Sequence, residues 1–299
     1  MSNTSSNLEF AAEVIRSGYV QSLAARDILV SHPAILNIGP ANGINSLKQT
    51  VREIANDGAD LYAVAGTEDA QVSPTTLGVA SDDVTVGRYS LNRLINGIAM
   101  DADSEVGQAL IAQDLFVASQ VTETSLCLAL ATGWSEITGD VSTEMSLVTF
   151  LEAIAEMEAR NVTGPFLFQG HSSHKRGLRL EQLLQVGGQI QYRPTVAGAA
   201  GQYGLVGSLF GVDLYFTNLA PTDTGGKAGQ MLGANSILHN WQNPSVSNAS
   251  SEIAVGNVKI IHAPIADRDQ DRWIGHLRTG WARYEPGSSE RGQRIRCRA

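Results

Sequence analysis

Apolar and polar residues alternate with a period of two in two segments of the first third of the chain. The outgoing segment comprises residues 50–54 and 60–64, and the returning segment comprises residues 84–91. Strict alternation rich in β-branched residues is typical of strands. The residues between them, 66–78, are small, polar and rich in turn formers. The pattern predicts an extended, two-stranded projection within residues 46–95.

This projection has no apolar core of its own. Because an isolated two-stranded ribbon is only marginally stable in water, we expect it to lie on another protein surface, most simply that of a second copy of the chain. Deletion of residues 60–84 is then predicted to leave a folded subunit that assembles poorly. Five charged residues of the projection are expected in contacts between copies: Arg52, Glu53, Glu68, Asp69 and Arg88.

A helical period of 3.6 residues is clearest between residues 104 and 132. Asp101, Asp103 and Ser104 supply capping and acidic groups at the positive end of the helix dipole. Gly133 is a typical terminator. A helix of about 29 residues is roughly 43 Å long, which indicates a spine along an elongated subunit. The apolar stripe comprises Val106, Leu110, Val117, Val121 and Leu128, widened by Ile111, Leu115 and Ala118.

The middle of the chain mixes the two periods. It predicts a second helix at residues 144–160, a buried strand at 166–169, a short helix at 178–186, and a strand or hairpin at 204–216. Residues 222–230 are polar and glycine-rich, and we expect a flexible loop there.

Strand-like alternation returns in the last part of the chain. Ile237, Leu238 and Trp241 indicate one strand, and residues 253–284 indicate more. Strands from distant parts of the sequence would have to share a sheet. The fold class is therefore predicted to be α+β.

The amino-acid composition restricts the possible folds and partners only partly. Charged residues make up 17% of the 299 residues, and there are 30 glycines. Low charge fits a surface covered by partners and equally fits a turn-rich β fold. The two cysteines, Cys127 and Cys297, indicate neither a disulfide framework nor a zinc site. The sequence shows no secretory signal and no apolar run of about 18 residues, so we expect synthesis in the cytosol and no membrane partner.

The net charge of −9 is unevenly distributed. Residues 1–160 carry 7 basic and 21 acidic residues, and residues 161–299 carry 14 and 9, so the halves have net charges of −14 and +5. Because the two halves carry opposite charge, contact between the acidic half of one copy and the basic half of another is electrostatically favourable. The alternative is that two solvated faces differ in charge by chance. The overall acidity argues against a dedicated nucleic-acid reader, which would carry a basic stripe.

Three clusters superficially resemble catalytic or ligand-binding sites. His171 and His174 fall in a run that we expect to form a polar loop. They have no third metal ligand at the right spacing, and the serines between them lack the glycine pattern of a nucleophile elbow. The glycines of residues 201–207 lack the order of a dinucleotide-binding loop. Residues 267–272 lack the glycine and the closing glutamate of a calcium loop. We therefore predict no catalytic, cofactor or metal site, and expect a charged turn or an inter-subunit contact from Asp267, Arg268, Asp269, Asp271 and Arg272.

Four arginines fall in the last residues of the chain, 286–299, which we expect to form a tail. As exposed charges they could meet DNA phosphates or the acidic half of a neighbouring copy, and both alternatives stay open. They are Arg291, Arg294, Arg296 and Arg298.

The order of these elements resembles that of a tailed-bacteriophage major capsid protein, a fold lineage shared with encapsulins. The resemblance covers nearly the whole chain, and a local pattern of glycine turn, strand and proline at residues 204–221 adds to it. It implies an N-terminal arm (1–45), an extended loop (46–95), a peripheral domain (96–139 and 249–285) with a spine helix (104–132), an axial domain (140–248) and a C-terminal tail (286–299).

The resemblance also implies a function without enzymatic activity or cofactor. Copies would assemble as hexamers and pentamers into an icosahedral shell around double-stranded DNA, with the extended loop over the adjacent subunit. The implied partners are further copies of the chain, a portal, and scaffolding and cement proteins. The implied location is the virion, after assembly in the host cytoplasm.

Two alternatives share parts of this pattern. An encapsulin-type compartment would have the same fold around an enzyme cargo, and a soluble α/β hydrolase would use His171 or His174. The projection departs from some capsid relatives because it has no lysine between Gln49 and Ile95. A cross-link from a loop lysine to an asparagine of a neighbour is therefore not expected.

Overall fold

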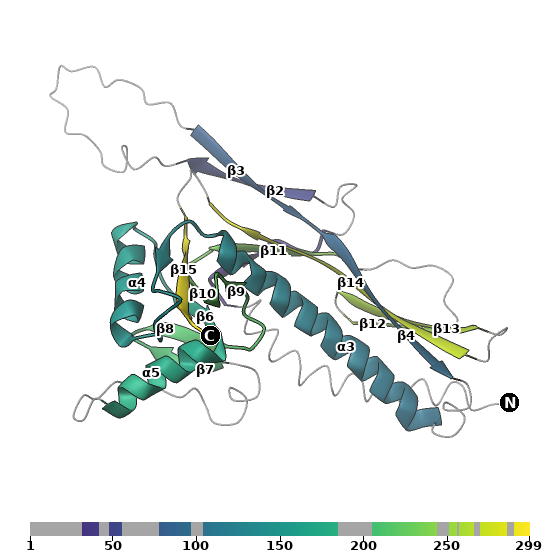
Figure 1. Cartoon of the computed structure of the whole chain (residues 1–299). Helices are drawn as coiled ribbons and strands as arrows, with labels where there is room; N and C mark the ends of the chain where they lie inside the picture. Colours follow the sequence, from purple (N-terminus) through teal and green to yellow (C-terminus); the bar gives the residue numbers. More distant parts are fainter. Residues whose placement is uncertain are drawn as a thin grey trace, which may run out of the picture.

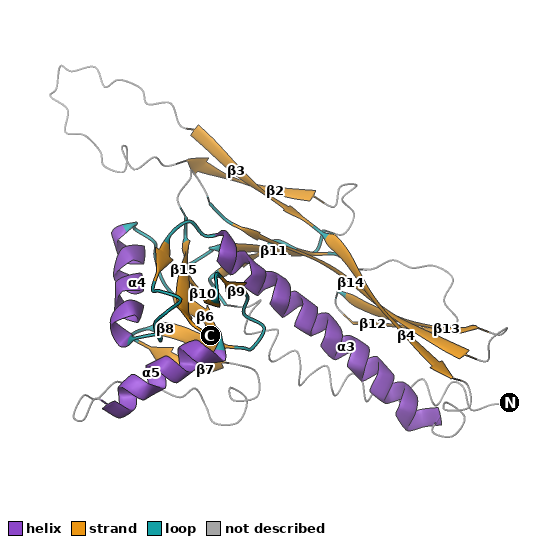
Figure 2. Cartoon of the chain, in the orientation of Figure 1, coloured by secondary structure: helices purple, strands orange, loops and turns teal. Residues whose placement is uncertain are grey.

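The computed structural model describes residues 32–41, 48–55, 78–96, 104–184, 205–243, 251–255, 257–265, 270–285 and 290–299. Within these ranges the chain forms two mixed sheets, a two-stranded hairpin and three α-helices (Figure 1). Two short helices lie with one sheet, and the long helix α3 runs alongside the strands of the other (Figure 2).

The six-stranded sheet is organised around β14, a strand of 14 residues. β14 pairs antiparallel with β4, β13 and β11, while β12 extends the sheet beyond β13 and β1 joins β11 in parallel. Strands from both ends of the chain thus share one sheet, as predicted. They are β1 (Ile35–Asn37), β4 (Gly87–Asn96), β11 (Ile237–Trp241), β12 (Ser251–Val255), β13 (Val258–Ile265) and β14 (Gln270–Arg283).

The long helix α3 (Ser104–Ala129) covers one face of this sheet. Its 26 residues span roughly 39 Å at 1.5 Å each, and a 3-10 turn (Leu130–Gly133) continues it. Leu115 of α3 is fully buried in one cluster with Trp273 of β14. The predicted long helix at residues 104–132 is confirmed, with its last turn in 3-10 form.

The stretch Asp114–Gly133 also meets the length and composition of a membrane-spanning helix. Buried helices of globular proteins meet the same criteria. Here Leu115, Cys127 and Leu128 are buried inside the subunit. Packing against the strands accounts for these buried residues, whereas Val117 and Val121 of the expected apolar stripe are 46% and 44% exposed.

The seven-stranded sheet holds a second core. Phe150 of α4 meets Phe168 of β6 edge to face, with ring centroids 5.6 Å apart, and Ile295 is fully buried in the same cluster. The Ser146 hydroxyl caps α4 by accepting a hydrogen bond from the Thr149 N–H. The elements are β5 (Ile137–Thr138), α4 (Leu147–Ala159), β6 (Phe166–Gly170), α5 (Ser172–Leu184), β7 (Leu205–Leu209), β8 (Val212–Phe216), β9 (Thr222–Asp223), β10 (Gly226–Leu232) and β15 (Gly292–Arg298).

The predicted projection starts as a hairpin of β2 (Lys48–Ala55) and β3 (Gly78–Thr85). Eight antiparallel residue pairs join the two strands along their full length. At the root of the hairpin, Val84 is fully buried against Leu238 and Tyr284. The hairpin is therefore anchored to the six-stranded sheet, on the face opposite α3.

The hairpin confirms one part of the predicted projection and corrects another. Residues 50–54 form a strand as predicted, and residues 60–64 lie outside the described residues. The returning segment 84–91 is divided, because β3 ends at Thr85 and β4 joins the six-stranded sheet. A deletion of residues 60–84 would remove the buried Val84, so a clean deletion has to stop before β3.

The last residues form a strand and not the expected tail at 286–299. β15 pairs with β10 over seven residue pairs and with β5 on its other edge. Arg294 and Arg296 both contact the Asp223 carboxylate, at 3.0 and 2.6 Å. Two of the expected tail arginines are therefore used inside the subunit.

The expected loop at residues 222–230 is also a strand region, since it contains β9 and much of β10. Its glycines lie where neighbouring backbones approach closely. A Cβ at Gly226 would meet the Cys297 carbonyl oxygen at 2.5 Å, and one at Gly229 would meet the Gln169 carbonyl oxygen at 2.9 Å. These glycines serve close strand packing and not loop flexibility.

Three further boundaries differ from those expected. β1 lies within the expected arm (1–45) and β11 lies within the expected axial range (140–248), yet both belong to the six-stranded sheet. Helix α5 begins at Ser172, earlier than the predicted helix at residues 178–186. The sheet to which β1 and β11 belong is determined by pairing between distant strands, and the local periodicity of the sequence carries no information on that pairing.

Candidate assembly surfaces

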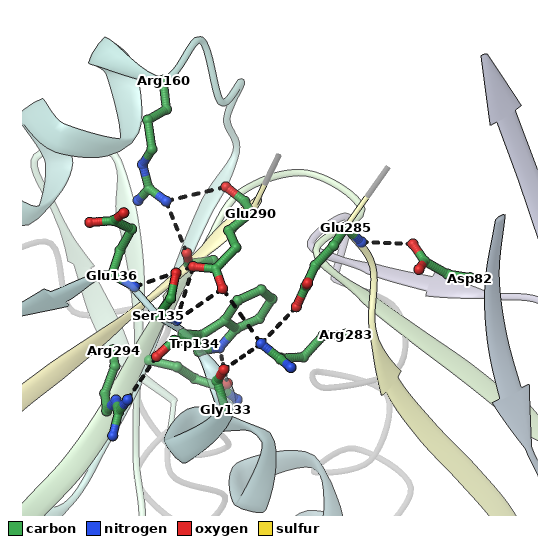
Figure 3. Close-up of polar contacts among 12 residues, drawn as sticks. Asp82, Gly133, Trp134, Ser135, Glu136, Arg160, Arg283, Glu285, Glu290 and Arg294 are labelled. Carbon is green, nitrogen blue, oxygen red and sulfur yellow. Dashed lines mark hydrogen bonds and ion pairs between the residues drawn. The ribbon is translucent and has the colours of Figure 1, made fainter. Parts of the chain in front are cut away.

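A joint of polar contacts connects the two sheets (Figure 3). Glu290, just before β15, accepts hydrogen bonds from the backbone N–H groups of Ser135 (2.9 Å) and Glu136 (3.2 Å). Arg283, the last residue of β14, lies 3.5 Å from the Glu290 carboxylate and has its guanidinium 5.4 Å from the Trp134 ring centroid. The joint ties the end of the spine helix to both sheets.

Two neighbouring elements enter the same joint. Arg160, at the end of α4, donates to the backbone carbonyl of Glu290 at 3.3 Å. Glu285 forms an ion pair with Arg283 at 2.7 Å, and its N–H donates to the Asp82 carboxylate of β3 at 2.8 Å. The hairpin, α4 and the two sheets therefore meet through one polar network (Figure 3).

The joint shifts the pKa values of its two carboxylates in opposite directions. Burial alone would raise the pKa of Glu290, but the N–H groups of Ser135 and Glu136 and the charge of Arg283 together lower that pKa. Burial raises the pKa of Glu285, which Arg283 opposes and the charges of Glu290 and Asp82 reinforce. The joint thus favours an ionised Glu290 and penalises an ionised Glu285.

Below the joint, buried side chains connect α3 to the seven-stranded sheet. Gln230 of β10 accepts from the Trp134 indole N–H at 3.0 Å. Its amide donates to the Gln169 side chain at 2.7 Å and to the Cys127 carbonyl at 3.2 Å. Burial raises the pKa of the Cys127 thiol to about 12, so this cysteine is an unreactive core residue.

The face of the six-stranded sheet opposite α3 gathers positive charge. Arg93 pairs with Asp114 of α3 at 2.9 Å, so alternate residues of β4 such as Arg88 point to the other face. Arg88 is directly opposite Arg278 in the strand register, and Ser90 is opposite His276. We use the term basic face for the side chains gathered there: Arg88, Lys259, Arg272, His276 and Arg278.

The pKa of His276 is lowered by its burial and by its position among these positive charges. Burial lowers the pKa of His276, and the charges of Arg88, Arg278 and Lys259 lower it further. The Ser90 hydroxyl lies 3.0 Å from His276 Nδ1. His276 is therefore mainly neutral near pH 7, and the arginines and the lysine carry the charge of the basic face.

Strand β4 forms an edge of the sheet beside the basic face. Among the described residues it pairs with β14 alone. Leu94 is 57% exposed, and Arg88, Ser90 and Asn92 are exposed as well. An open edge strand offers unpaired backbone groups to a strand or loop of another chain.

The residues predicted to contact other copies fall into three groups. Arg88 and Arg272 are exposed on the basic face. Arg52 is exposed on β2, Glu53 lies in the same strand, and Asp271 lies in β14. No contact between copies is tested for any of them, so they stay predictions. The other five lie outside the part of the chain that the structure describes: Glu68, Asp69, Asp267, Arg268 and Asp269.

The sequence analysis missed three members of the basic face: Lys259, His276 and Arg278. The period-two spacing of Arg272, His276 and Arg278 was a signal that they share a face. The register that places Arg88 opposite Arg278 joins residues almost 200 positions apart, and no local pattern reports it.

His171 and His174 lie at the start of α5 and not in the polar loop expected there. His174 is fully buried, accepts a hydrogen bond from the His171 N–H (3.1 Å), and has Nε2 3.3 Å from the Ile295 carbonyl oxygen. Burial lowers the pKa of His174 to about 4. Both ring nitrogens are engaged, so His174 connects α5 to β15. Within the described ranges, no three His, Cys, Asp or Glu side chains are grouped to hold a metal.

Solved structures of shell proteins share this fold. The chain aligns with the capsid of Ralstonia phage GP4 at a TM-score of 0.60, with 9% identity over 90% of this chain and 87% of the other. It aligns with the capsid of a native GTA particle at 0.57, with 10% identity over 92% and 91%. The holo-SrpI encapsulin complex from Synechococcus elongatus PCC 7942 aligns at 0.54, with 10% identity over 83% and 81%.

No protein-family model matches the sequence, and no curated protein sequence is similar to it. The class therefore rests on the structure: the chain has the α+β fold of phage capsid and encapsulin subunits. This confirms the resemblance inferred from the order of the elements. The proteins named in the comparison are structural components of shells and not enzymes.

Proposed function

We propose that the chain is a major capsid protein of a tailed bacteriophage. Copies assemble as hexamers and pentamers into an icosahedral shell that encloses double-stranded DNA. The observation that carries this proposal is the alignment of 92% of this chain with 91% of a capsid subunit. The likeness concerns the whole subunit and not a single module.

The arrangement of the subunit suits such an assembly. A hairpin with a buried root leaves the body of the subunit, and an open edge strand lies beside the basic face. Identical copies related by rotation bring one surface of a subunit against a different surface of the next. Many contacts that are individually weak then accumulate into a stable shell.

The proposal includes further partners and a location. A portal occupies one vertex, and scaffolding or cement proteins assist or reinforce the shell. The packaged DNA is contacted without sequence preference. Assembly takes place in the host cytoplasm and the product is the virion capsid. No lysine lies between Gln49 and Ile95 for a covalent cross-link from the loop, so non-covalent contacts or cement proteins hold the shell.

Gel filtration with light scattering tests self-assembly directly. Purified protein, treated with nuclease and tested over a range of salt and protein concentrations, is expected to elute partly as particles of very high mass. A monomer or dimer in every buffer would contradict the proposal.

An encapsulin-type compartment is the second candidate, favoured by the alignment with the SrpI encapsulin complex. Genes for a portal and a terminase beside this gene would favour the capsid, whereas a gene for an enzyme cargo would favour the compartment. A soluble hydrolase that uses His174 is not favoured, because this side chain is buried with both ring nitrogens engaged.

A further inference from the structure

A single acidic side chain is buried beneath the spine helix. Glu123 of α3 is 5% exposed, and among the described residues it is the one Asp or Glu that the folded subunit buries. It lies between Leu115 and Cys127, which are fully buried on the same helix. Charged side chains are almost never fully buried unless they are paired. The partners of Glu123 therefore decide what this residue does.

A histidine of the six-stranded sheet lies beside this acid. His239 of β11 is fully buried, and its Nε2 lies 3.8 Å from Glu123 Oε1. The same nitrogen lies 3.1 Å from the Thr279 hydroxyl of β14. The imidazole ring stacks on Trp281, with ring centroids 4.0 Å apart. These contacts hold the ring in one orientation, with Nε2 towards the helix.

Asn257, just before β13, bonds to the same carboxylate oxygen. Its side-chain amide donates to Glu123 Oε1, and the whole residue is buried. The carboxylate therefore connects α3 to the beginning of β13 and, through His239, to β11 and β14. This polar cluster adjoins the apolar contact between Leu115 and Trp273.

Two further titratable side chains pack near this part of the helix, and both stay uncharged. Burial raises the pKa of Cys127, one turn along α3, to about 12. Burial also raises the pKa of Tyr215, on β8 in the same cluster as Cys127, to about 12. Neither side chain can balance a charge on Glu123 or on His239 near neutral pH.

Within the described ranges, the charged groups on the neighbouring elements have other partners or lie on the other side of the sheet. Arg93 of β4 pairs with Asp114, which is about 13 Å along the helix from Glu123. Arg283, at the end of β14, pairs with Glu285 at the joint. The basic face is on the opposite side of the sheet, because alternate residues of β13 and β14 contact α3.

The pair of Glu123 and His239 is neutral when it holds one proton. Without that proton the buried site carries an uncompensated carboxylate, and with a second proton it carries an uncompensated imidazolium. Burial of an unpaired charge is costly. In the unfolded chain a glutamate releases its proton near pH 4.3 and a histidine near about pH 6.5. Folding therefore favours the one-proton form, and the titration belongs to the pair and not to either residue.

We propose that Glu123 and His239 form a buried one-proton site that holds the spine helix on the six-stranded sheet. Loss of this proton, or uptake of a second one, weakens the contact. The contribution to stability is fully present between about pH 4.3 and 6.5, and is lost as pH rises above or falls below these limits. The inference goes beyond the proposed function, because it concerns the subunit itself and requires no assembly.

Urea unfolding of the unassembled subunit over a range of pH tests this proposal. The reference is the double variant Glu123→Gln with His239→Gln, in which neither side chain titrates. The ratio of the wild-type unfolding constant to that of the variant is expected to rise about tenfold from pH 6 to pH 8.5, and about tenfold from pH 5 to pH 3, since tenfold corresponds to a one-unit difference in pKa between the folded and unfolded states.

The single variants complete a double-mutant cycle. At about pH 6 the unfolding constant of the double variant is expected to differ about tenfold from the product of the two single effects, because residues in contact are coupled. The coupling is expected to fall at pH 8.5, where the pair has lost its proton.

Two measures keep the comparison specific. Glu152→Gln changes an exposed carboxylate of α4 and is expected to keep the wild-type pH profile. If the double variant does not fold, Glu123→Gln alone serves as the reference between pH 6 and pH 8.5, because a lone histidine cannot form the pair.

Two results would overturn the inference. A ratio that stays constant from pH 3 to pH 8.5 would show that the pair is a fixed polar contact. A ratio that changes in one direction only would show that one residue titrates on its own. Either result would leave the proposed function intact, since neither measurement depends on assembly.

Discussion

Single buried polar residues join the two sheets of the subunit. Gln230 is fully buried and satisfies groups on α3 and β6 at once. Glu290 fills a similar position at the joint, where two backbone N–H groups converge on its carboxylate. Such residues contribute most to the free energy of unfolding when the removal of one hydrogen-bond partner leaves the other buried and unsatisfied.

Replacement of Gln230 by Leu is expected to lower the free energy of unfolding by about 2–4 kcal/mol, because Trp134 loses its acceptor and Gln169 its donor. Urea unfolding of the unassembled subunit measures the change. A double-mutant cycle with Trp134→Phe provides the control, since the two residues share one hydrogen bond. A coupling of about 1 kcal/mol is expected, and strictly additive effects would show that the bond contributes nothing.

Glu290→Gln is expected to destabilise the subunit at pH 7 by about 1–2 kcal/mol, because charge-assisted hydrogen bonds to Ser135 and Glu136 are weakened. The folded state lowers the pKa of Glu290. Its contribution is therefore present above the unfolded-state pKa and is lost as pH falls through the folded-state pKa. The stability difference between wild type and variant should shrink below about pH 4.

Glu285→Gln is the matched control, because the same joint raises the pKa of Glu285. Its ionised form is disfavoured by folding, so wild type gains stability at this site as pH falls through the folded-state pKa. The substitution is expected to be neutral or stabilising at pH 7. Equal losses from both substitutions would contradict the assignment of opposite roles.

At the scale of elements, the sequence predicts what local periodicity encodes. The apolar stripe of α3 and the alternation at residues 50–54 each gave the right element, because every residue that defines the pattern lies nearby. β15 was missed although residues 293, 295 and 297 alternate with arginines, since four arginines in eight residues also fit an exposed tail. Asp223, the partner of Arg294 and Arg296, is about 70 residues away.

Replacement of residues 56–77 by an Asn-Gly turn is expected to leave a folded subunit that assembles poorly. Ala55 and Gly78 are paired across the hairpin, so a two-residue turn can close it, and Val84 stays in place. Thermal unfolding should show an unchanged or higher melting temperature, since a shorter loop costs less entropy. Loss of folding would mean that the segment belongs to the core of the subunit.

Truncation before Gly292 is expected to abolish folding, because β10 and β5 then lose the strand between them. Removal of the exposed Ala299 alone is the control and should have no effect. Circular dichroism and solubility of the purified proteins measure the outcome. A soluble, folded truncation would mean that these residues act as the tail first expected.

At the scale of the whole molecule, the features agree on a subunit built for contact with copies of itself. The spine helix and joint hold two sheets together, and the hairpin leaves the body (Figure 1). Arg88 and Arg272 of the basic face are exposed beside the edge strand β4. The basic face depends on the register between β4 and β14, so the sequence predicted two of its five members and no more. The fold likeness to capsids extends over nearly the full length of the chain.

Electron cryomicroscopy of the purified wild-type protein tests the central claim most directly. The account predicts closed shells with fivefold vertices, in which the hairpin of each subunit lies over its neighbour. A preparation that shows only monomers or dimers, at every salt and protein concentration at which the protein is folded, would contradict it.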